Sequence, residues 1–494
     1  MPIVEKDGKK VISFAPRVQN REPLTYQDLV TGNQARALFE KIAKTQGEAE
    51  ARKAVVGMPS YTNSRNVFGN LDTTDLIVAG VLAGQNICLI GPTGRGKSQL
   101  AEDFSNHFFG GKYADGGSSV VVKGSNDLES IDPVFVRINP VTKRPELTGA
   151  HNSAFYNIEE FNRCLDFVQN QLYDIFNHRF IAKDGSQLPL GVDNYASMIA
   201  TANAPGTNDG RATFESPNSL WNRFAVILDQ TNPLFDLTRE DKDFYQFHRG
   251  QSGSGVVSTS RNDLLRKILG ANKEISSKVI LSNPEALSAF LMATRGLETF
   301  VCGKEKATLG DNWPTHIPCG NGCTEDYANL RTWVTSPFGR SPLDIQRYAS
   351  ALKYLSTLKD PNCNISDSEF IFRAFELNGA YQPGVLNPNV LNTKFAGDNH
   401  AMAREIADRL TAEYNSERGE RLITSVERAM KGKKTKFFQF GDNICAGDIE
   451  DIPASLRERV TEIPSGLDSR GDVDYSSVLG AVDYTRELNG SGSE

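Results

Sequence analysis

The chain has 494 residues, 39% of them hydrophobic and 23% charged, and 42 glycines, a composition typical of globular proteins that bury a core. Its length is sufficient for about two to four domains. The formal net charge is −7, but residues 441–494 alone hold twelve Asp or Glu against four Arg. The rest of the chain is therefore close to neutral, which argues against a protein that binds polyanions through its overall charge.

Cysteine usage and hydropathy indicate the cellular setting. Seven scattered cysteines, an odd number, argue against a disulfide-stabilised scaffold and favour reduced thiols. The most apolar window, residues 76–91, is too short to span a membrane, and Gln85 and Asn86 interrupt it. The first residues lack the pattern of a secretory signal peptide. We therefore expect a soluble, cytoplasmic protein that does not associate with membranes.

Residues 1–60 are predicted to form an N-terminal segment, with a short strand at residues 10–14 and helices at residues 26–30 and 33–56. This segment carries no recognisable chemistry. A helix is predicted at residues 73–82, directly before the first strong motif.

That motif, GPTGRGKS, follows an apolar run at residues 86–90 and leads into a predicted helix. Its glycines allow backbone amides to surround a phosphate, while Lys97 reaches the β- and γ-phosphates and the Ser98 hydroxyl can hold Mg²⁺. Strand, loop and helix in this order predict a Walker A loop that binds ATP; the alternative is an ordinary turn with a surface lysine. The candidate nucleotide-binding residues are Gly91, Pro92, Thr93, Gly94, Arg95, Gly96, Lys97, Ser98 and Gln99.

The alternation of strands and helices is interrupted after a strand predicted at residues 118–123. Residues 127–149 contain the turn-forming pair Asp132-Pro133 and a basic stretch at residues 137–144. They are predicted to form an insert that extends beyond the core, and a long surface loop is the alternative.

A second apolar strand, residues 153–158, ends in the adjacent carboxylates Glu159 and Glu160. This is the arrangement of a Walker B motif, in which the first carboxylate assists Mg²⁺ and the second polarises the attacking water. The alternative is a pair of glutamates that begins a helix and interacts favourably with its dipole. We favour the catalytic interpretation because the Walker A loop lies upstream.

Three further features follow in order. Residues 179–190 are predicted to form a β-hairpin on an Asp184-Gly185 turn, after a helix with apolar residues at helical spacing. The strand at residues 197–203 ends in Asn203, whose neutral amide can orient the lytic water. Arg223 comes just before a strand predicted at residues 225–228.

Together these segments resemble the AAA+ ATPases, and among them the MoxR-like branch of the clade with a helix-2 insert and a pre-sensor-1 hairpin. The resemblance rests on GPTGRGKS, NIEEFNR, FIAKDGSQLPL, MIATANAP and SLWNRF, in this order. It covers residues 60–230 well and residues up to about 380 loosely. The implied fold is α/β: a P-loop AAA+ core of a parallel sheet flanked by helices at residues 61–235, followed by a helical lid at residues 258–380.

The resemblance also implies roles for single residues. Glu160 becomes the catalytic base, Asn203 the sensor 1 residue and Arg223 an arginine finger for the ATP of a neighbouring subunit. Lys97 and Ser98 hold the phosphates and Mg²⁺, with Glu159 as the second Mg²⁺ ligand. An arginine that acts on a neighbour implies hydrolysis only in a ring. A surface arginine is the alternative for Arg223, and Arg163 is a second candidate at the same interface.

The sequence departs from the family in two places. Glu159 stands where the family has aspartate, which shifts the carboxylate by about a bond length that water can bridge. The sensor 2 position, where the family has arginine, holds Leu343. Arg347, one turn further along the predicted helix, or Arg340 could substitute.

The predicted lid is interrupted by a loop at residues 300–329 that contains a possible zinc site. Its candidate ligands are Cys302, His316, Cys319 and Cys323. Thiolates and imidazole suit zinc, but the spacing is irregular, so a glycine-rich loop with free thiols is favoured. A C-terminal helical extension is predicted at residues 381–440, followed by an acidic tail at residues 441–494 that is too polar to build a core alone.

Three functions fit this sequence. The first is a ring-forming ATPase, with six subunits expected, that remodels, activates or assembles a protein client; MoxR-like proteins typically act with a von Willebrand factor A domain partner. The second is a nucleic-acid motor, which the basic insert supports but for which no known nucleic-acid-binding domain is recognisable. The third is a structural subunit in which ATP organises assembly without turnover.

Overall fold

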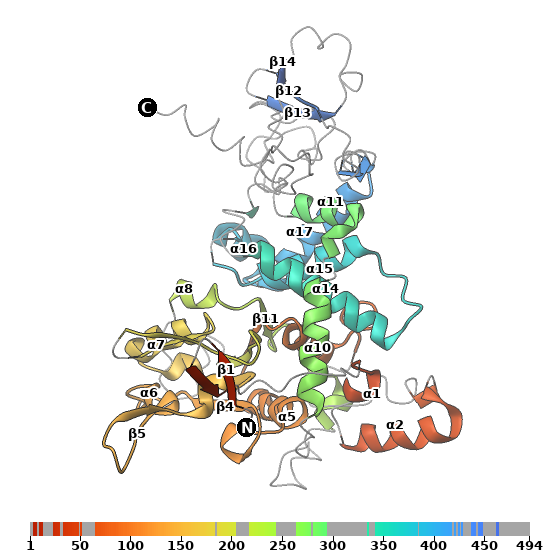
Figure 1. Cartoon of the computed structure of the whole chain (residues 1–494). Coiled ribbons are helices and arrows are strands. Elements are labelled where there is room, and N and C mark those ends of the chain that lie inside the picture. The colour runs from red at the N-terminus through yellow and green to blue at the C-terminus, as the bar shows by residue number, and fades with distance from the viewer. Residues whose placement is uncertain are drawn as a thin grey trace, which may run out of the picture. The chain divides into compact units, whose positions relative to one another are not determined.

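In the computed structural model the chain forms two compact units (Figure 1). The first unit comprises residues 1–278 and 350–364, and the second comprises residues 279–349 and 365–494. The structure describes residues 3–6, 9–12, 23–29, 33–48, 50–51, 65–182, 185–203, 217–243, 263–277, 280–293, 333–334, 341–383, 385–416, 419–420, 423–424, 426–427, 436–440, 443–447 and 461–463.

A five-stranded sheet forms the centre of the first unit. Its spatial order is β11-β3-β10-β7-β4, and every neighbouring pair is parallel. The strands are β3 (Asn86–Ile90), β4 (Ser119–Lys123), β7 (Phe155–Glu159), β10 (Ser197–Ala202) and β11 (Val226–Asp229). All residues of β3 and β10 are buried, as expected for strands covered on both faces. The predicted α/β class with a parallel sheet is therefore confirmed.

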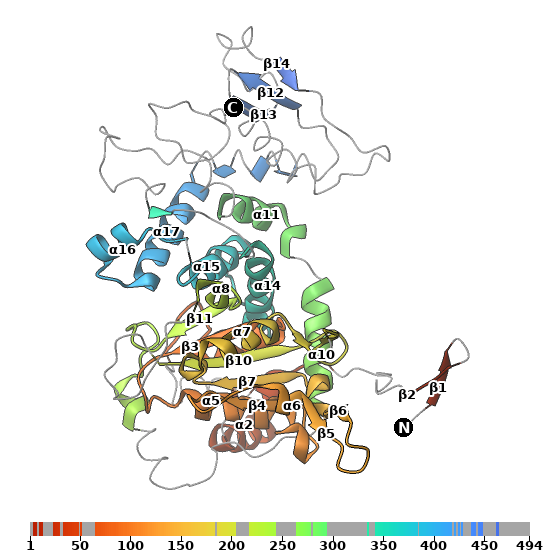
Figure 2. The ribbon, with the colours of Figure 1, turned by 90° about the vertical axis from the view of Figure 1, so that its left-hand side faces the viewer.

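The register of these strands creates one common edge. Ile90, the last residue of β3, pairs with Ala202 of β10 and with Asp229 of β11. Glu159 pairs with Lys123 at the end of β4. Figure 2 shows β3, β10 and β7 next to one another in the sheet. The segments that follow these strands therefore leave the sheet side by side.

Helices surround this sheet in the first unit. They include α4 (Thr73–Leu82), α5 (Lys97–Phe109), α7 (Asp166–Ile175) and α10 (Asp263–Ser277), and α10 packs on both α4 and α5. A capping box starts α4, because Asp72 accepts from the Asp75 amide at 2.9 Å and Asp75 accepts from the Asp72 amide at 2.8 Å. The N-terminal α1 (Tyr26–Leu29) and α2 (Asn33–Gln46) also belong to this unit.

Both predicted excursions are β-hairpins. The insert at residues 127–149 contains α6 (Asp132–Phe135) and the antiparallel pair β5 (Val136–Ile138) and β6 (Pro145–Leu147), so it is not an irregular surface loop. The Asn139 side chain closes its turn by accepting from the amides of Val141 and Thr142. The second hairpin pairs β8 (Arg179–Ile181) with β9 (Gln187–Pro189), as predicted, although Asp184 lies outside the described residues.

The second unit contains a group of packed helices. These are α11 (Pro284–Leu291), α15 (Asp367–Gly379), α16 (Pro388–Phe395) and α17 (Asn399–Tyr414), and α15 packs against both α11 and α17. The helix α14 (Ser341–Lys359) is shared, because its residues from 350 onward belong to the first unit. Helices predicted as one lid thus fall into both units.

Strands near both ends of the chain differ from the sequence prediction. A three-stranded antiparallel sheet joins β12 (Lys436–Phe440), β13 (Asn443–Gly447) and β14 (Thr461–Ile463), where a helical extension and a polar tail were expected. The apolar residues of FFQF and NICAG favour strands, but these runs are short and surrounded by polar sequence. A hairpin of β1 (Ile3–Lys6) and β2 (Lys9–Ile12) replaces the single strand predicted at residues 10–14.

Several predictions concern residues outside the described part of the chain. They include the loop at residues 300–329 with Cys302, His316, Cys319 and Cys323, and the alternative sensor 2 residue Arg340. Among the described residues, Cys88, Cys164 and Cys363 are free thiols, and no group of three or more possible metal ligands occurs. No helix in the described ranges has the length and apolarity needed to cross a membrane.

We predict that Gly124, directly after β4, cannot be replaced by alanine without loss of stability. Its amide donates to the Glu159 carbonyl at 2.7 Å, and an added Cβ would lie 2.4 Å from the Glu160 carbonyl oxygen. Because the obstructing atoms are backbone, Gly124→Ala should lower the free energy of unfolding by about 1–3 kcal/mol, measured by urea denaturation. Gly149→Ala is the control, since its Cβ would meet only the Tyr113 ring at 3.6 Å. Equal stability of the two variants would contradict this prediction.

Candidate functional site

The glycine-rich loop connects β3 to α5 at the common edge of the sheet. Gly94 and Gly96 have φ angles of 85° and 80°, which side-chain-bearing residues rarely adopt, and Gly96 is the N-cap of α5. This turn exposes the first amides of α5, which have no acceptors within the helix. The loop and helix start therefore provide N–H donors and a favourable dipole for an anion, as a phosphate site requires.

Lys97 is the first residue of α5 and is buried, with 6% of its surface exposed. Its ammonium donates to two carbonyls of its own loop, at 2.6 Å to Gly91 and 2.9 Å to Pro92. Burial lowers the pKa of Lys97 to about 8, and the negative charge of Glu160 partly offsets this effect. A cation held by neutral carbonyls at a helix start can exchange them for the oxygens of a phosphate.

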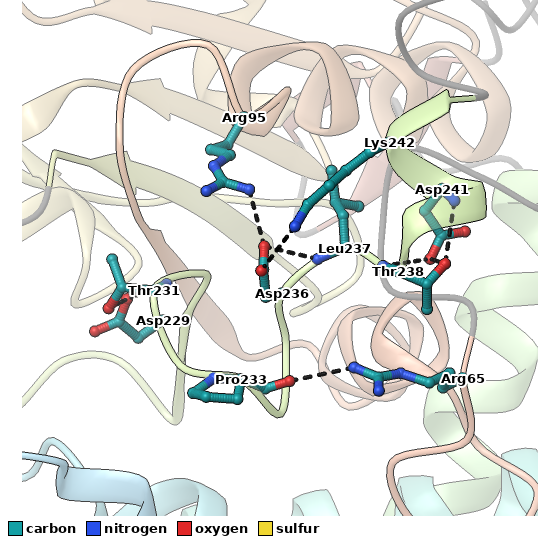
Figure 3. A network of polar contacts seen from close by, with 10 residues as sticks. All are labelled: Arg65, Arg95, Asp229, Thr231, Pro233, Asp236, Leu237, Thr238, Asp241 and Lys242. Atoms are coloured by element: carbon teal, nitrogen blue, oxygen red, sulfur yellow. Dashed lines mark hydrogen bonds and ion pairs between the residues drawn. The ribbon is translucent and has the colours of Figure 1, made fainter.

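Arg95 anchors the loop to the segment that follows β11 (Figure 3). Its Nη1 lies 2.8 Å from Asp236 Oδ1, and Lys242 Nζ lies 3.1 Å from the other oxygen of the same carboxylate. Gln230 adjoins the start of the loop, because its amide donates to the Ile90 carbonyl at 2.8 Å. Asp236 and Lys242 were not predicted from the sequence, because they lie in a polar stretch without a recognisable motif.

Glu159 ends β7 at the edge of the sheet. Its Oε1 accepts from Asn157 Nδ2 at 3.1 Å, and Lys123 is its register partner on β4. Burial raises the pKa of Glu159, while the charge of Lys123 and the Asn157 hydrogen bond lower it. Mg²⁺ prefers oxygen ligands such as carboxylates and hydroxyls. The side chains of Glu159 and Ser98 are therefore chemically suited to bind Mg²⁺.

Glu160 leaves the strand in the left-handed conformation, with a φ of 49°. Its amide donates to Thr201 Oγ1 on β10 at 2.9 Å, and its Oε2 pairs with Arg163 Nη1 at 2.8 Å. An unusual backbone conformation in a non-glycine residue persists only where its surroundings hold it. Here the neighbouring strand fixes the backbone and Arg163 fixes the carboxylate.

Asn203 directly follows β10 and is 2% exposed. Its backbone makes two hydrogen bonds with the Asn162 side chain, which donates to the Asn203 carbonyl at 3.1 Å and accepts from its amide at 3.3 Å. With the Asn203 amide oriented to satisfy its surroundings, Oδ1 accepts from Arg163 Nε at 3.2 Å and Nη2 at 2.9 Å. Glu160, Arg163 and Asn203 are therefore brought together.

Arg223 lies at the opposite edge of the sheet. Its carbonyl accepts from Asn86 Nδ2 at 2.9 Å, and Asn86 is the first residue of β3, whereas the phosphate loop follows the last. The five residues of β3 separate the two edges by about 13 Å from the first Cα to the last, at about 3.3 Å per residue. The Arg223 guanidinium stacks 4.3 Å from the ring centroid of Tyr173 on α7 and donates to its hydroxyl.

Three other predicted residues have the following surroundings. Gln99 Nε2 donates to Asp103 Oδ1 at 3.1 Å, within α5 itself. Arg347 is exposed on the part of α14 that belongs to the second unit, so its role as a sensor 2 residue stays a prediction. Arg163, the second interface candidate, is 7% exposed and contacts residues of its own subunit.

Comparison with known proteins shows a family similarity over part of the chain. Residues 86–224 match the family model of the AAA domain of the dynein-related subfamily. Among solved structures, a presumed ATPase from Cytophaga hutchinsonii is 15% identical in sequence, and the match covers 77% of this chain and 98% of that one with a TM-score of 0.47. A search of curated protein sequences gave no match. Residues 86–224 are therefore similar to the AAA domain of the dynein-related subfamily, and the parallel sheet that they help to form has a P-loop α/β fold.

Proposed function

We propose that this protein is a MoxR-like AAA+ ATPase that hydrolyses ATP in a ring and couples hydrolysis to the remodelling, activation or assembly of a protein client. The observation that carries the proposal is the convergence of Lys97, Glu160 and Asn203 at the carboxyl edge of one parallel sheet. Ligands of open α/β sheets bind at this edge. The buried Lys97 would bind phosphate and the Glu160 carboxylate would act as the base. The fixed amide of Asn203 would orient the water.

The charges of the side chains at the site suggest the role of each residue. The amides of the loop and the Lys97 ammonium would hold the β- and γ-phosphates, and Glu160 would accept the proton of the attacking water. Ser98 and Glu159 would hold Mg²⁺. When bound, the ion would neutralise part of the negative charge on the phosphates. A cation beside Glu159 would also favour its ionised form, against the effect of burial.

The position of Arg223 supports the ring. The Arg223 backbone lies at the edge of the sheet opposite its own phosphate loop, and its guanidinium contacts Tyr173 on α7. Tyr173 holds its guanidinium in one orientation through stacking and a hydrogen bond. A fixed arginine distant from its own site suits a residue that acts on the nucleotide of a neighbouring subunit.

The insert hairpin supports a protein client. Val141 at its turn is 86% exposed, and Ile138 and Leu147 on its strands are 61% and 45% exposed. An apolar group on an extension is typical of a surface that contacts protein. Arg137, Lys143 and Arg144 flank it and keep a nucleic-acid motor as the second candidate, which DNA-stimulated turnover with a steep salt dependence would favour.

The first prediction separates binding from turnover. Lys97→Ala should abolish ATP binding because it removes the phosphate-facing ammonium, whereas Glu160→Gln should bind ATP normally and lose turnover by about 10²–10⁴-fold. Calorimetric titration and a phosphate-release assay measure the two effects. Equal loss of binding in both variants would refute the assigned roles, and a wild type that binds ATP without turnover would favour the structural subunit.

The second prediction concerns Arg223. Arg223→Ala should keep ATP affinity and lose roughly three orders of magnitude in turnover, since the guanidinium acts in the transition state. Mixing Arg223→Ala with Glu160→Gln subunits should restore activity above either alone, because some interfaces then join an intact finger to an intact site. Arg266→Ala, exposed on α10, is the control and should change neither property. Mixed rings without restored activity would rule out action on a neighbour.

The third prediction follows from the pKa of about 8 for Lys97. Because burial favours the neutral amine, Lys97 is mostly charged below pH 8 and mostly neutral above it, and phosphate binding must raise its pKa. ATP affinity should therefore fall as the pH rises above about 8, and binding at about pH 8.5 should take up protons. Calorimetry in buffers of different ionisation enthalpy detects this uptake. Lys97→Arg should remove it, since arginine stays charged; uptake unchanged in that variant would exclude Lys97 as its source.

A further inference from the structure

Arg163 is the most deeply buried arginine at the site, yet the mechanism above gives it no role. It is 7% exposed and lies on a short 3-10 turn, residues 161–163, directly after the catalytic carboxylate. The turn closes on itself, because the Arg163 amide donates to the Glu160 carbonyl at 2.9 Å. The chain therefore folds the arginine back onto the residue that precedes the turn.

The guanidinium divides its donors between two strands. One nitrogen, Nη1, pairs with Glu160 Oε2 at 2.8 Å, after β7. The other edge, Nε and Nη2, donates to the Asn203 oxygen at 3.2 Å and 2.9 Å, after β10. A planar fork with fixed donor directions sets the distance and angle between the two groups that it joins. A lysine ammonium also has several donors, but it lacks the planar fork and so does not fix this angle.

This contact also determines how each partner can act. Because Arg163 takes the Asn203 oxygen, the amide can present only its Nδ2 hydrogens to a ligand. Because Arg163 pairs with Oε2 of Glu160, it fixes the direction in which the carboxylate presents its acceptor sites. Asn162 holds the Asn203 backbone in the same turn. One amide donor and one carboxylate acceptor are thus fixed relative to each other.

We infer that Arg163 is a positioning residue that holds the Glu160 carboxylate and the Asn203 amide in register, so that both act on the same water molecule. The inference rests on the proposed ATP hydrolysis. It differs from the expectation that Arg163 faces a neighbouring subunit, because Arg163 is 7% exposed and contacts Glu160 and Asn203 of its own chain. Arg163 acts through Glu160 and Asn203 and needs no contact with the nucleotide.

The test compares Arg163→Gln and Arg163→Lys with wild type, Asn203→Ala and the double variant Arg163→Gln/Asn203→Ala. Arg163→Gln should lower kcat by about 10²-fold while the KM for ATP changes less than about threefold, because alignment affects only the reacting state. Arg163→Lys keeps the charge but not the fork, and should recover only about a tenth of the wild-type kcat. The double variant should be no more than about threefold slower than Asn203→Ala, since the two residues act as a unit.

Subunit mixing distinguishes action within a subunit from action on a neighbour. Arg163→Gln and Glu160→Gln both disable their own site, so mixed rings of the two should show no restored turnover, in contrast to the Arg223→Ala mixture. Melting temperatures and ADP affinity check that each variant is folded, and Arg266→Gln is the matched surface control. Should Arg163→Gln fail these checks, Arg163→Lys carries the kcat comparison and the mixing.

Three outcomes would overturn the inference: a wild-type kcat in Arg163→Gln, multiplicative losses in the double variant, or restored activity in the mixture with Glu160→Gln. A wild type that binds ATP but shows no turnover would refute the proposed function itself, and the inference with it. Normal wild-type turnover with an unaffected Arg163→Gln would refute the inference alone.

Discussion

The parallel pairing of β3, β7 and β10 is the constraint on which the site depends. Parallel strands end at the same edge of a sheet, and the register here pairs Ile90 with Ala202. The phosphate loop, the two carboxylates and Asn203 therefore emerge side by side, although more than a hundred residues separate the first from the last. Backbone hydrogen bonds set these positions, and the side chains then supply the chemistry.

Short-range patterns made much of this site predictable from sequence. The glycines of residues 91–96, the carboxylates that end β7 and the polar end of β10 each follow a strand directly, so local sequence indicates both the element and the edge. The β8–β9 hairpin was equally predictable from its turn residues. The family match over residues 86–224 covers all of these features.

Contacts between distant segments could not be predicted in the same way. Asp236 meets Arg95, 141 residues earlier, only because β11 lies beside β3, and no local pattern announces that pairing. Arg163 was a second candidate for the subunit interface, because an exposed and a buried arginine look alike in sequence. The structure places it on a short turn where it is 7% exposed. The strands at residues 436–447 were missed because a β-sheet in a polar region depends on partners outside each strand.

The strand β11 connects two features that otherwise seem unrelated. Arg223 precedes its first residue, and Gln230 and Asp236, which adjoin the phosphate loop, follow its last. A buried, hydrogen-bonded strand has low compressibility, so it transmits a displacement from one end to the other. In the proposed ring, a force on Arg223 from the nucleotide of one subunit would be transmitted to the phosphate loop of the next through the four residues of β11. Nucleotide binding at one site of the ring would then affect the neighbouring site without a rigid-body movement of a domain.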